Sequence, residues 1–375
     1  MGLDFTATSL TARSDVRTQL TPGITAVAGI DVEYWRFDVN WRFAATNIDS
    51  TQSTGSFYGR PPTVLKGTGG LFQPAGYALF ELIPTSGLKL FPGVRADYDS
   101  GSARWTVDPR LGARYDVHPG FPRTTLKGGV GLYHQPPQAY QSIEPFGTPG
   151  VRSPRAFQTS LGVEQELSQP VELSVELFYK DLKQLVVPVP SNATENGLSY
   201  QNLGSGRAYG SELLLRYKPQ GRFFGWVAYT LSRSERRDGP GLPTYRYDYD
   251  QTHILTALGS YKLGRGWQAG MRFRYVTGSP YTPELGGIMD YDSGSYAPIT
   301  SPEQNSRRQG AFHQLDARID KTWKFSAWQL SAYLDVQNTY FRENPEGVAY
   351  NYNYSKSSAV TGLPFLPIIG LRGEL

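Results

Sequence analysis

Residues 247–283, YDYDQTHILTALGSYKLGRGWQAGMRFRYVTGSPYTP, hold two alternating segments joined by the tight turn Gly264-Arg265-Gly266. In the second segment, one set of alternate positions carries large or apolar residues: Trp267, Ala269, Met271, Phe273 and Tyr275. The positions between them carry Gln268, Gly270, Arg272 and Arg274. Because side chains alternate between the two faces of a β-strand, this pattern predicts one apolar face and one basic face. Such a strand suits a barrel wall with lipid outside and water inside.

The same alternation recurs along the whole chain. Besides the two segments above, it predicts strands at about residues 5–20, 24–43, 75–83, 88–98, 105–117, 124–134, 157–167, 171–179, 201–217, 223–234, 312–323, 328–340 and 364–375. Seven short turns fall on alternate connections, and longer Gly-, Pro- and Tyr-rich connections are predicted at 44–74, 135–154, 188–200, 279–309 and 341–361. Outer-membrane barrels have this asymmetry, with short turns on the periplasmic side and long loops outside.

We therefore predict an all-β fold, a transmembrane antiparallel up-and-down β-barrel of about 15–16 strands, with residues 1–375 forming a single domain. A count of fifteen raises a problem, because bacterial barrels have an even number of strands and both ends inside. Two explanations stay open. The barrel is truncated, or part of residues 345–356 forms an additional strand.

Composition excludes several classes of protein. The chain has no cysteine and a net charge of +4, with aromatic residues at 13%. Disulfide frameworks and cysteine-ligated metals are thereby excluded, and the charge is too mild to indicate a nucleic-acid partner. No apolar run is long enough for a transmembrane helix. The first fifteen residues lack the pattern of a signal peptide, so we expect either a processed or engineered chain, or part of a longer protein.

Several segments resemble the C-terminal barrel of TonB-dependent outer-membrane receptors. They are LFPGVRADYDSGSARWTVDPRLGARYDV (90–117), LKGGVGLYHQPPQ (126–138), RAFQTSLGVEQEL (155–167), FYKDLKQLVV (178–187), GRAYGSELLLRYKPQGRFFGWVAYTLSRSERRDGPG (206–241), DYDQTHIL (248–255), RYVTGSPYTP (274–283), FHQLDARIDKTW (312–323), YLDVQNTYFRENPEG (333–347) and GLPFLPIIGLRGEL (362–375). The resemblance implies a location in the bacterial outer membrane and contact with its lipid. It also implies a complete barrel of 22 strands around an N-terminal plug domain, of which this chain would hold about the last fifteen strands and no plug.

The resemblance further implies three kinds of partner. TonB is expected only if the N-terminal region that contacts it is present, and a small-molecule ligand is expected at the barrel. The last strand resembles the signal that the barrel-assembly machinery reads, which involves Gly370, Leu371 and Leu375. Gly373 and Leu375 depart from the aromatic residues usual in that signal.

Two groups of residues are candidate ligand contacts. The first group consists of basic side chains predicted to line the lumen: Arg95, Arg110, Arg114, Lys127, Arg272, Arg274 and Arg318. They are either a salt-paired inner wall or a lining that draws anionic ligands such as ferric chelates, since guanidinium groups bind carboxylate and phosphate. The second group consists of loop tyrosines, either ligand-stacking or rim aromatics: Tyr281, Tyr291, Tyr296, Tyr350, Tyr352 and Tyr354.

Nothing in the sequence predicts catalysis, a cofactor or a resident metal. The four histidines are scattered, and no segment resembles a nucleophile elbow. The acidic residues around YDSGS (291–295) are better explained by an ordinary Asp/Gly turn than by a cation site. The leading hypothesis is a receptor that takes up a scarce nutrient such as a ferric siderophore. The alternatives are a plugless, porin-like pore or surface-exposed binding protein, and then an enzyme or a soluble β-protein.

Overall fold

The computed structural model describes residues 2–43, 63–142, 147–189, 200–291 and 294–375. Fifteen long strands follow one another in a single sheet in the order in which they occur along the chain, and every neighbouring pair is antiparallel. They are β1 (Gly2–Thr21), β2 (Ile24–Phe43), β3 (Thr63–Thr85), β4 (Leu88–Asp99), β5 (Arg104–His118), β6 (Thr124–His134), β7 (Arg155–Ser168), β8 (Val171–Pro188), β9 (Tyr200–Gln220), β10 (Phe223–Arg237), β12 (His253–Gly264), β13 (Trp267–Val276), β18 (Phe312–Lys324), β19 (Gln329–Gln337) and β22 (Leu366–Glu374). The described residues thus form the predicted up-and-down sheet.

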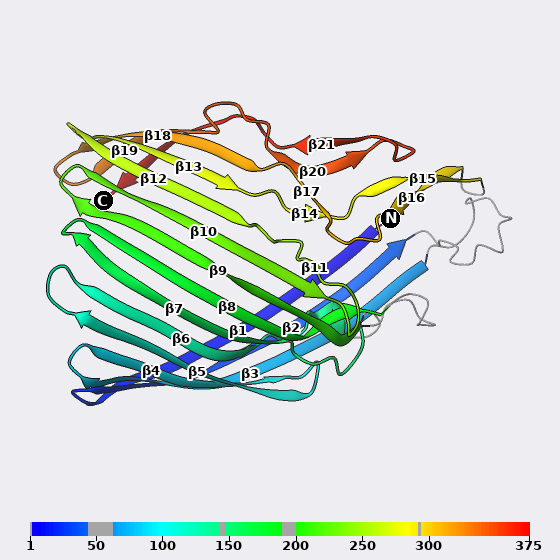
Figure 1. Ribbon diagram of the computed structural model, residues 1–375, viewed down its shortest axis with the longest axis horizontal. Helices are drawn as coiled ribbons and strands as arrows, with labels where there is room; N and C mark the ends of the chain where they lie inside the picture. Colours follow the sequence, from blue (N-terminus) through cyan, green and yellow to red (C-terminus); the bar gives the residue numbers. More distant parts are fainter. Residues whose placement is uncertain (1, 44–62, 143–146, 190–199, 292–293) are drawn as a thin grey trace.

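Short turns gather at one end of the curved sheet and loops at the other (Figure 1). Two-residue turns join β1 to β2 and β12 to β13, for example. One connection on the loop side is nevertheless short, because only residues 100–103 separate β4 from β5. Asp99 closes this turn by accepting a hydrogen bond from the backbone N–H of Ser102 (2.9 Å). The predicted alternation of short and long connections therefore has one exception.

Three predicted loops contain strands instead. Residues 63–74 were predicted as part of a loop, but they extend β3 and pair with β2 up to Phe43↔Thr63. The loop predicted at 279–309 holds two small antiparallel sheets, β14 (Pro280–Tyr281) with β17 (Arg307–Arg308) and β15 (Glu284–Asp290) with β16 (Ser295–Thr300). The loop predicted at 341–361 holds β20 (Pro345–Tyr350) and β21 (Ser357–Thr361). β20 pairs only with β21 among the described residues, so it adds no strand to the wall.

The remaining elements are short and lie on the loop side. They are the helix α1 (Ala139–Ser142) and the strand β11 (Tyr245–Arg246), which pairs with the end of β10. No helix in the described part of the chain is long and apolar enough to cross a membrane, a finding that does not bear on β-barrels.

The polarity of the sheet is inverted relative to that of a soluble protein. On β5, Trp105 and Val107 are 64% and 53% exposed, whereas Asp108 beside them is only 8% exposed. The same contrast continues along the wall, where Leu161, Leu177 and Met271 are among the large exposed apolar residues. A water-soluble sheet would bury these side chains, so the outer face is suited to contact with acyl chains.

The two ends of the chain lie at opposite ends of the sheet. The N-terminus lies beside the loops and the C-terminus beside the turns, as expected for fifteen strands (Figure 1). No pairing joins β1 to β22 within the described ranges. Closure of the sheet into a complete barrel therefore stays a prediction.

Candidate functional site

The inner face of the sheet is lined by ion pairs, some within one strand and others between strands that are one or two places apart in the sheet. Five of the seven basic residues predicted to line the lumen are held by carboxylates: Arg95 by Asp97 (2.8 Å) and Asp31 (3.4 Å), Arg114 by Glu164 (2.6 Å), Lys127 by Glu176 (2.7 Å), Arg272 by Asp316 (2.6 Å) and Arg318 by Asp320 (2.7 Å). These cations already have protein partners, so a role for them in ligand binding stays a prediction.

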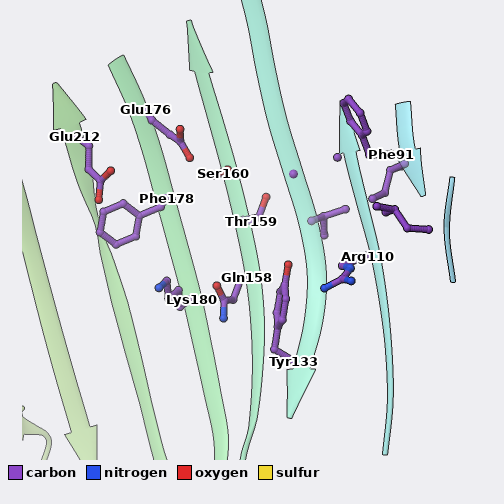
Figure 2. A pocket seen from close by; sticks show the side chains of 15 residues that line it. Phe91, Arg110, Tyr133, Gln158, Thr159, Ser160, Glu176, Phe178, Lys180 and Glu212 are labelled. Carbon is purple, nitrogen blue, oxygen red and sulfur yellow. The ribbon is translucent and has the colours of Figure 1, made fainter. Parts of the chain in front are cut away.

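The other two cations have different surroundings. The guanidinium of Arg274 lies over the ring of Phe312, with 5.6 Å between its central carbon and the ring centroid. Arg110 is half-buried, and its side chain makes no hydrogen bond or ion pair with any described residue. Its side chain points into a hollow of about 540 Å³ in the inner wall. Figure 2 shows Arg110 beside Tyr133, with Gln158 and Lys180 on the next strands.

Strand register explains why the wall is hollow there. One row across the sheet pairs Gly112 of β5 with Gly129 of β6, and Gly129 with Ser160 of β7. Two glycines and a serine leave little side-chain volume above the backbone. Phe178 of β8 follows in the same row and closes the hollow on one side. The volume lies in the usual range for small-molecule pockets.

A second cavity, of about 670 Å³, lies at the loop end of the same wall. It shares Tyr133 and Gln158 with the first hollow, so the two are neighbours along the sheet. The guanidinium of Arg236 lies 4.0 Å from the centroid of the Tyr247 ring at this cavity. Tyr245, also in its lining, donates a hydrogen bond to Asp238 (2.6 Å). Burial, and then the Asp238 carboxylate, raise the pKa of the Tyr245 phenol, so it stays a neutral donor.

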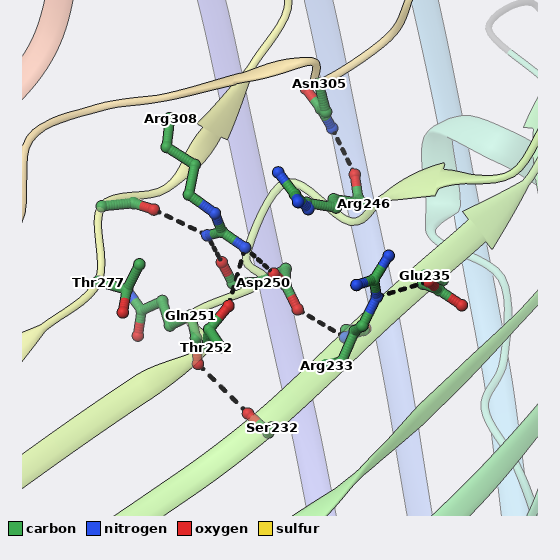
Figure 3. A network of polar contacts seen from close by, with 12 residues as sticks. Ser232, Arg233, Glu235, Arg246, Asp250, Gln251, Thr252, Thr277, Asn305 and Arg308 are labelled. Atoms are coloured by element: carbon green, nitrogen blue, oxygen red, sulfur yellow. Dashed lines mark hydrogen bonds and ion pairs between the residues drawn. The ribbon is translucent and has the colours of Figure 1, made fainter.

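The long loop between β13 and β18 is anchored near this cavity by a buried ion pair. Arg308 of β17 pairs with Asp250, whose side chain is 1% exposed (Figure 3). The guanidinium of Arg308 also donates to the Thr252 hydroxyl (3.0 Å) and to the carbonyl of Gly278 (3.0 Å). The second carboxylate oxygen of Asp250 accepts a hydrogen bond from the N–H of Ser234 (2.6 Å) on β10. One ion pair thus ties the loop to the wall.

The structure brings four of the six predicted loop tyrosines together. Tyr296 of β16 meets Tyr352 edge to face at 5.7 Å between centroids, and Tyr350 lies 6.0 Å from Tyr354. The Tyr350 hydroxyl also accepts a hydrogen bond from the N–H of Glu284 (3.0 Å), which links the two loop hairpins. The remaining two are placed differently: Tyr291 is 89% exposed beyond β15, and Tyr281 lies in β14. Contact of any of them with a ligand stays a prediction.

The residues of the predicted assembly signal lie on the last strand. Gly370 faces Tyr333 across the β19–β22 pair, and a Cβ at Gly370 would overlap the Tyr333 ring. Leu371 and Leu375 are highly exposed. Gly370 therefore has a packing reason for its identity, whereas its role in assembly stays a prediction.

The histidines make local contacts. His134 bonds Asp108 (2.6 Å), His253 bonds Tyr229 (2.8 Å) and His313 bonds Tyr340 (2.8 Å). His118 contacts two carbonyl groups of its own turn. Among the described residues, no group of three or more His, Asp or Glu side chains is arranged to hold a metal ion.

Sequence reasoning missed Tyr133, Gln158 and Lys180 as cavity residues. The available signal was the glycine-rich segment LKGGVGLY (126–133), in which two successive inward positions, Gly129 and Gly131, are glycines. Such a segment predicts a gap in side-chain volume only when the partner strands are placed in register.

Comparisons with known proteins agree with this architecture. The profile of the family described as "TonB dependent receptor-like, beta-barrel" matches residues 2–338. No match to a curated protein sequence was found.

Solved structures with a similar fold include three proteins that are described as transporters or as an import receptor. The outer membrane transporter YddB from Escherichia coli aligns with a TM-score of 0.68 at 12% identity, over 99% of this chain and 55% of that one. The FrpB iron transporter from Neisseria meningitidis aligns with a TM-score of 0.67 at 14% identity, over 98% of this chain and 55% of that one. The ferric-catecholate import receptor Fiu from E. coli K12 aligns with a TM-score of 0.64 at 16% identity, over 99% of this chain and 55% of that one. The chain thus spans about half the length of these structures.

Three observations lead to the same assignment: the inverted polarity of the sheet, the asymmetry of its connections and the family match. The chain belongs to the TonB-dependent receptor-like β-barrel family and is located in the outer membrane of a Gram-negative bacterium.

Proposed function

We propose that these residues form the transport and ligand-receiving barrel of a receptor that takes up a scarce nutrient, such as a ferric siderophore. The observation that carries this proposal is the cavity of about 670 Å³ at the loop end of the inner wall. Its lining combines cations, hydrogen-bond donors and aromatic rings, including Arg155, Arg236 and Tyr247. Iron chelates are large, often anionic and often aromatic, so these groups suit them.

The similar structures support the same class of ligand. One is described as a ferric-catecholate import receptor and another as an iron transporter. We propose that lipid surrounds the outer face and that the barrel-assembly machinery recognises β22. TonB is proposed as a partner of a receptor that contains this barrel together with the region that contacts TonB.

Binding of a ferric tris-catecholate complex tests the proposal. The purified chain, in detergent or lipid nanodiscs, is titrated with the complex while quenching of its intrinsic fluorescence is followed. We expect saturable binding that weakens about tenfold in Arg236→Met, which removes the cation at the cavity. Tyr261→Phe, on the wall strand β12, is the matched control and leaves binding unchanged. An equal quench of wild type and Arg236→Met would reject the assignment of this cavity.

A passive pore or a surface-exposed binding protein is the second candidate, because the inner wall carries open hollows. Conductance in planar bilayers separates the candidates. A large, constant current without ligand indicates a pore. Silent bilayers combined with ligand binding that depends on Arg236 indicate a receptor. Silent bilayers combined with ligand binding that depends on loop residues and not on Arg236 indicate surface binding alone.

A further inference from the structure

Three successive rows of inward side chains differ in how their charges are compensated. In the first row, Arg114 and Lys127 are paired with Glu164 and Glu176. The second row is the floor of small residues formed by Gly112, Gly129 and Ser160. The third row runs from Arg110 through Gly131 and Gln158 to Lys180, across β5, β6, β7 and β8.

The third row holds two cations without carboxylate partners. Arg110 and Lys180 are half-buried, and neither forms an ion pair with a described residue. Lys180 has only a distant contact with the Phe178 ring, at 5.9 Å from the centroid. Partial burial of an unpaired cation is unfavourable. Two rows away, Arg114 and Lys127 are both paired, so the lack of partners here is a local property of the wall.

The space around these cations is bounded by rings. Tyr133 leans over Gly131, where an added Cβ would lie 2.9 Å from the Tyr133 ring. Phe178 closes the opposite side, and Gly129 is open, since an added Cβ there would meet nothing closer than 3.7 Å. The carboxylates of Glu176 and Glu212 also line the hollow, two rows from Arg110 and Lys180; Glu176 pairs with Lys127 (2.7 Å), and Glu212 is in no ion pair with a described residue. The end beside Arg110 and Lys180 is therefore the positive end.

We propose that this hollow is a second binding site, selective for a small molecule with an aromatic ring and a carboxylate. The ring would lie on the glycine floor between Tyr133 and Phe178. The carboxylate would accept hydrogen bonds from Arg110, with Gln158 and Lys180 as further donors. The proposal rests on the proposed function in one respect, namely that the inner face lines the route of the solute.

The geometry sets the size of the ligand. Arg110 and Lys180 are three strands apart, so their Cα atoms are separated by about 14 Å at the usual spacing of about 4.8 Å between strands. Both side chains line the hollow, so a ligand whose carboxylate contacts both cations lies between β5 and β8. The volume of about 540 Å³ accommodates a fused two-ring system.

Three probes that share one ring system and carry a negative, a neutral and a positive substituent test the proposal. The chain in lipid nanodiscs is titrated with 2-naphthoate, 2-naphthylmethanol and 2-naphthylmethylamine, and binding is measured by calorimetry. We expect saturable binding of the carboxylate alone. Arg110→Met and Lys180→Met each weaken it roughly tenfold or more, because a charge-assisted hydrogen bond is lost. Lys89→Met, which removes an inward cation of β4 that pairs with Glu81, leaves it unchanged.

A second variant guards against loss of folding as the explanation. Gly129→Leu fills the hollow without removing a charge, and the open space above Gly129 accepts the side chain. We expect it to abolish naphthoate binding while the heat-modifiable electrophoretic shift of the folded barrel persists. Equal binding of all three probes, or unchanged binding in Arg110→Met and Gly129→Leu, would overturn the proposal.

The outcome is distinguishable from failure of the proposed function. If the ferric complex binds in an Arg236-dependent manner and naphthoate does not bind, only the second site is rejected. If naphthoate binds in an Arg110-dependent manner and the ferric complex does not, the inner site stands and the iron-chelate function fails.

Discussion

At the scale of single residues, the position of a side chain relative to the sheet decides its effect. Outward positions hold exposed Leu, Val, Trp and Met, whereas inward positions hold paired charges. The energetic reason is the change of solvent across one strand: hydrocarbon disfavours charge, while enclosed water and carboxylates stabilise it. The same substitution at two adjacent positions of a strand should therefore change the free energy of unfolding by very different amounts.

Replacing Leu177 tests this difference. Leu177 is 57% exposed near the middle of the membrane-length part of β8, opposite Leu161 in register. We expect Leu177→Arg to lower the free energy of unfolding by about 2–4 kcal/mol, measured by urea titration in lipid vesicles. Ser174→Arg, on the inward face beside Glu164, should have little effect. Equal losses in both variants would contradict the assigned faces.

Gly370 offers a second residue-scale prediction. Its missing side chain accommodates the ring of Tyr333, over which the Arg318 guanidinium lies at 3.9 Å from the centroid. Gly370→Ala should destabilise the barrel by about 1–3 kcal/mol through overpacking. Gly373→Ala on the same strand meets no atom within 4 Å and serves as the control. In a double-mutant cycle, the additional change Tyr333→Ala should remove most of the Gly370→Ala penalty, and strict additivity would argue against the contact.

At the scale of elements, the wall strands and the loop hairpins are stabilised differently. The wall has continuous backbone pairing, whereas the loop between β13 and β18 depends on a few side-chain contacts with Asp248 and Asp250. Asn305 donates to Asp248 (2.6 Å), and Arg308 pairs with Asp250. A loop held in this way can detach while the wall stays folded.

Asp250→Asn tests that separation. Loss of the carboxylate leaves Arg308 without its ionic partner, which costs up to about 3–5 kcal/mol when a buried pair is broken. We expect amide hydrogen exchange to accelerate throughout residues 277–311 and to stay unchanged in β13 and β18. Glu303→Gln in the same loop removes a charge that is in no ion pair with a described residue, and should leave exchange unaltered. Faster exchange in the wall strands of Asp250→Asn would show that the loop is not an independent unit.

At the scale of the whole molecule, the apolar outer face determines where the chain is stable. Large exposed apolar side chains occur across the whole sheet, from Phe5 on the first strand, β1, to Ile369 on the last strand, β22. We expect the folded chain to require detergent or lipid and to aggregate when either is removed, as followed by light scattering and tryptophan fluorescence. A monodisperse, folded chain in plain buffer would contradict the membrane assignment.

The period-two alternation by itself predicted most of the strands and the face of each side chain, because a strand directs successive residues to opposite sides. The short turns between the strands predicted their antiparallel order. The start and end of β6, for example, agree with the prediction from sequence. Residues 63–74 were missed because their Gly- and Pro-rich composition favours a loop locally, whereas pairing with β2 provides the hydrogen bonds that make them a strand.

Only the tertiary structure decided which inward charges have partners. Arg110 and Arg114 are indistinguishable by sequence pattern, yet Arg114 meets Glu164 (2.6 Å), which is 50 residues away along the chain, and Arg110 meets no carboxylate among the described residues. The physical reason is register: each row of the inner wall takes one residue from each of several consecutive strands, and the register of each pair decides whether charge meets charge, or glycine meets glycine and leaves a cavity.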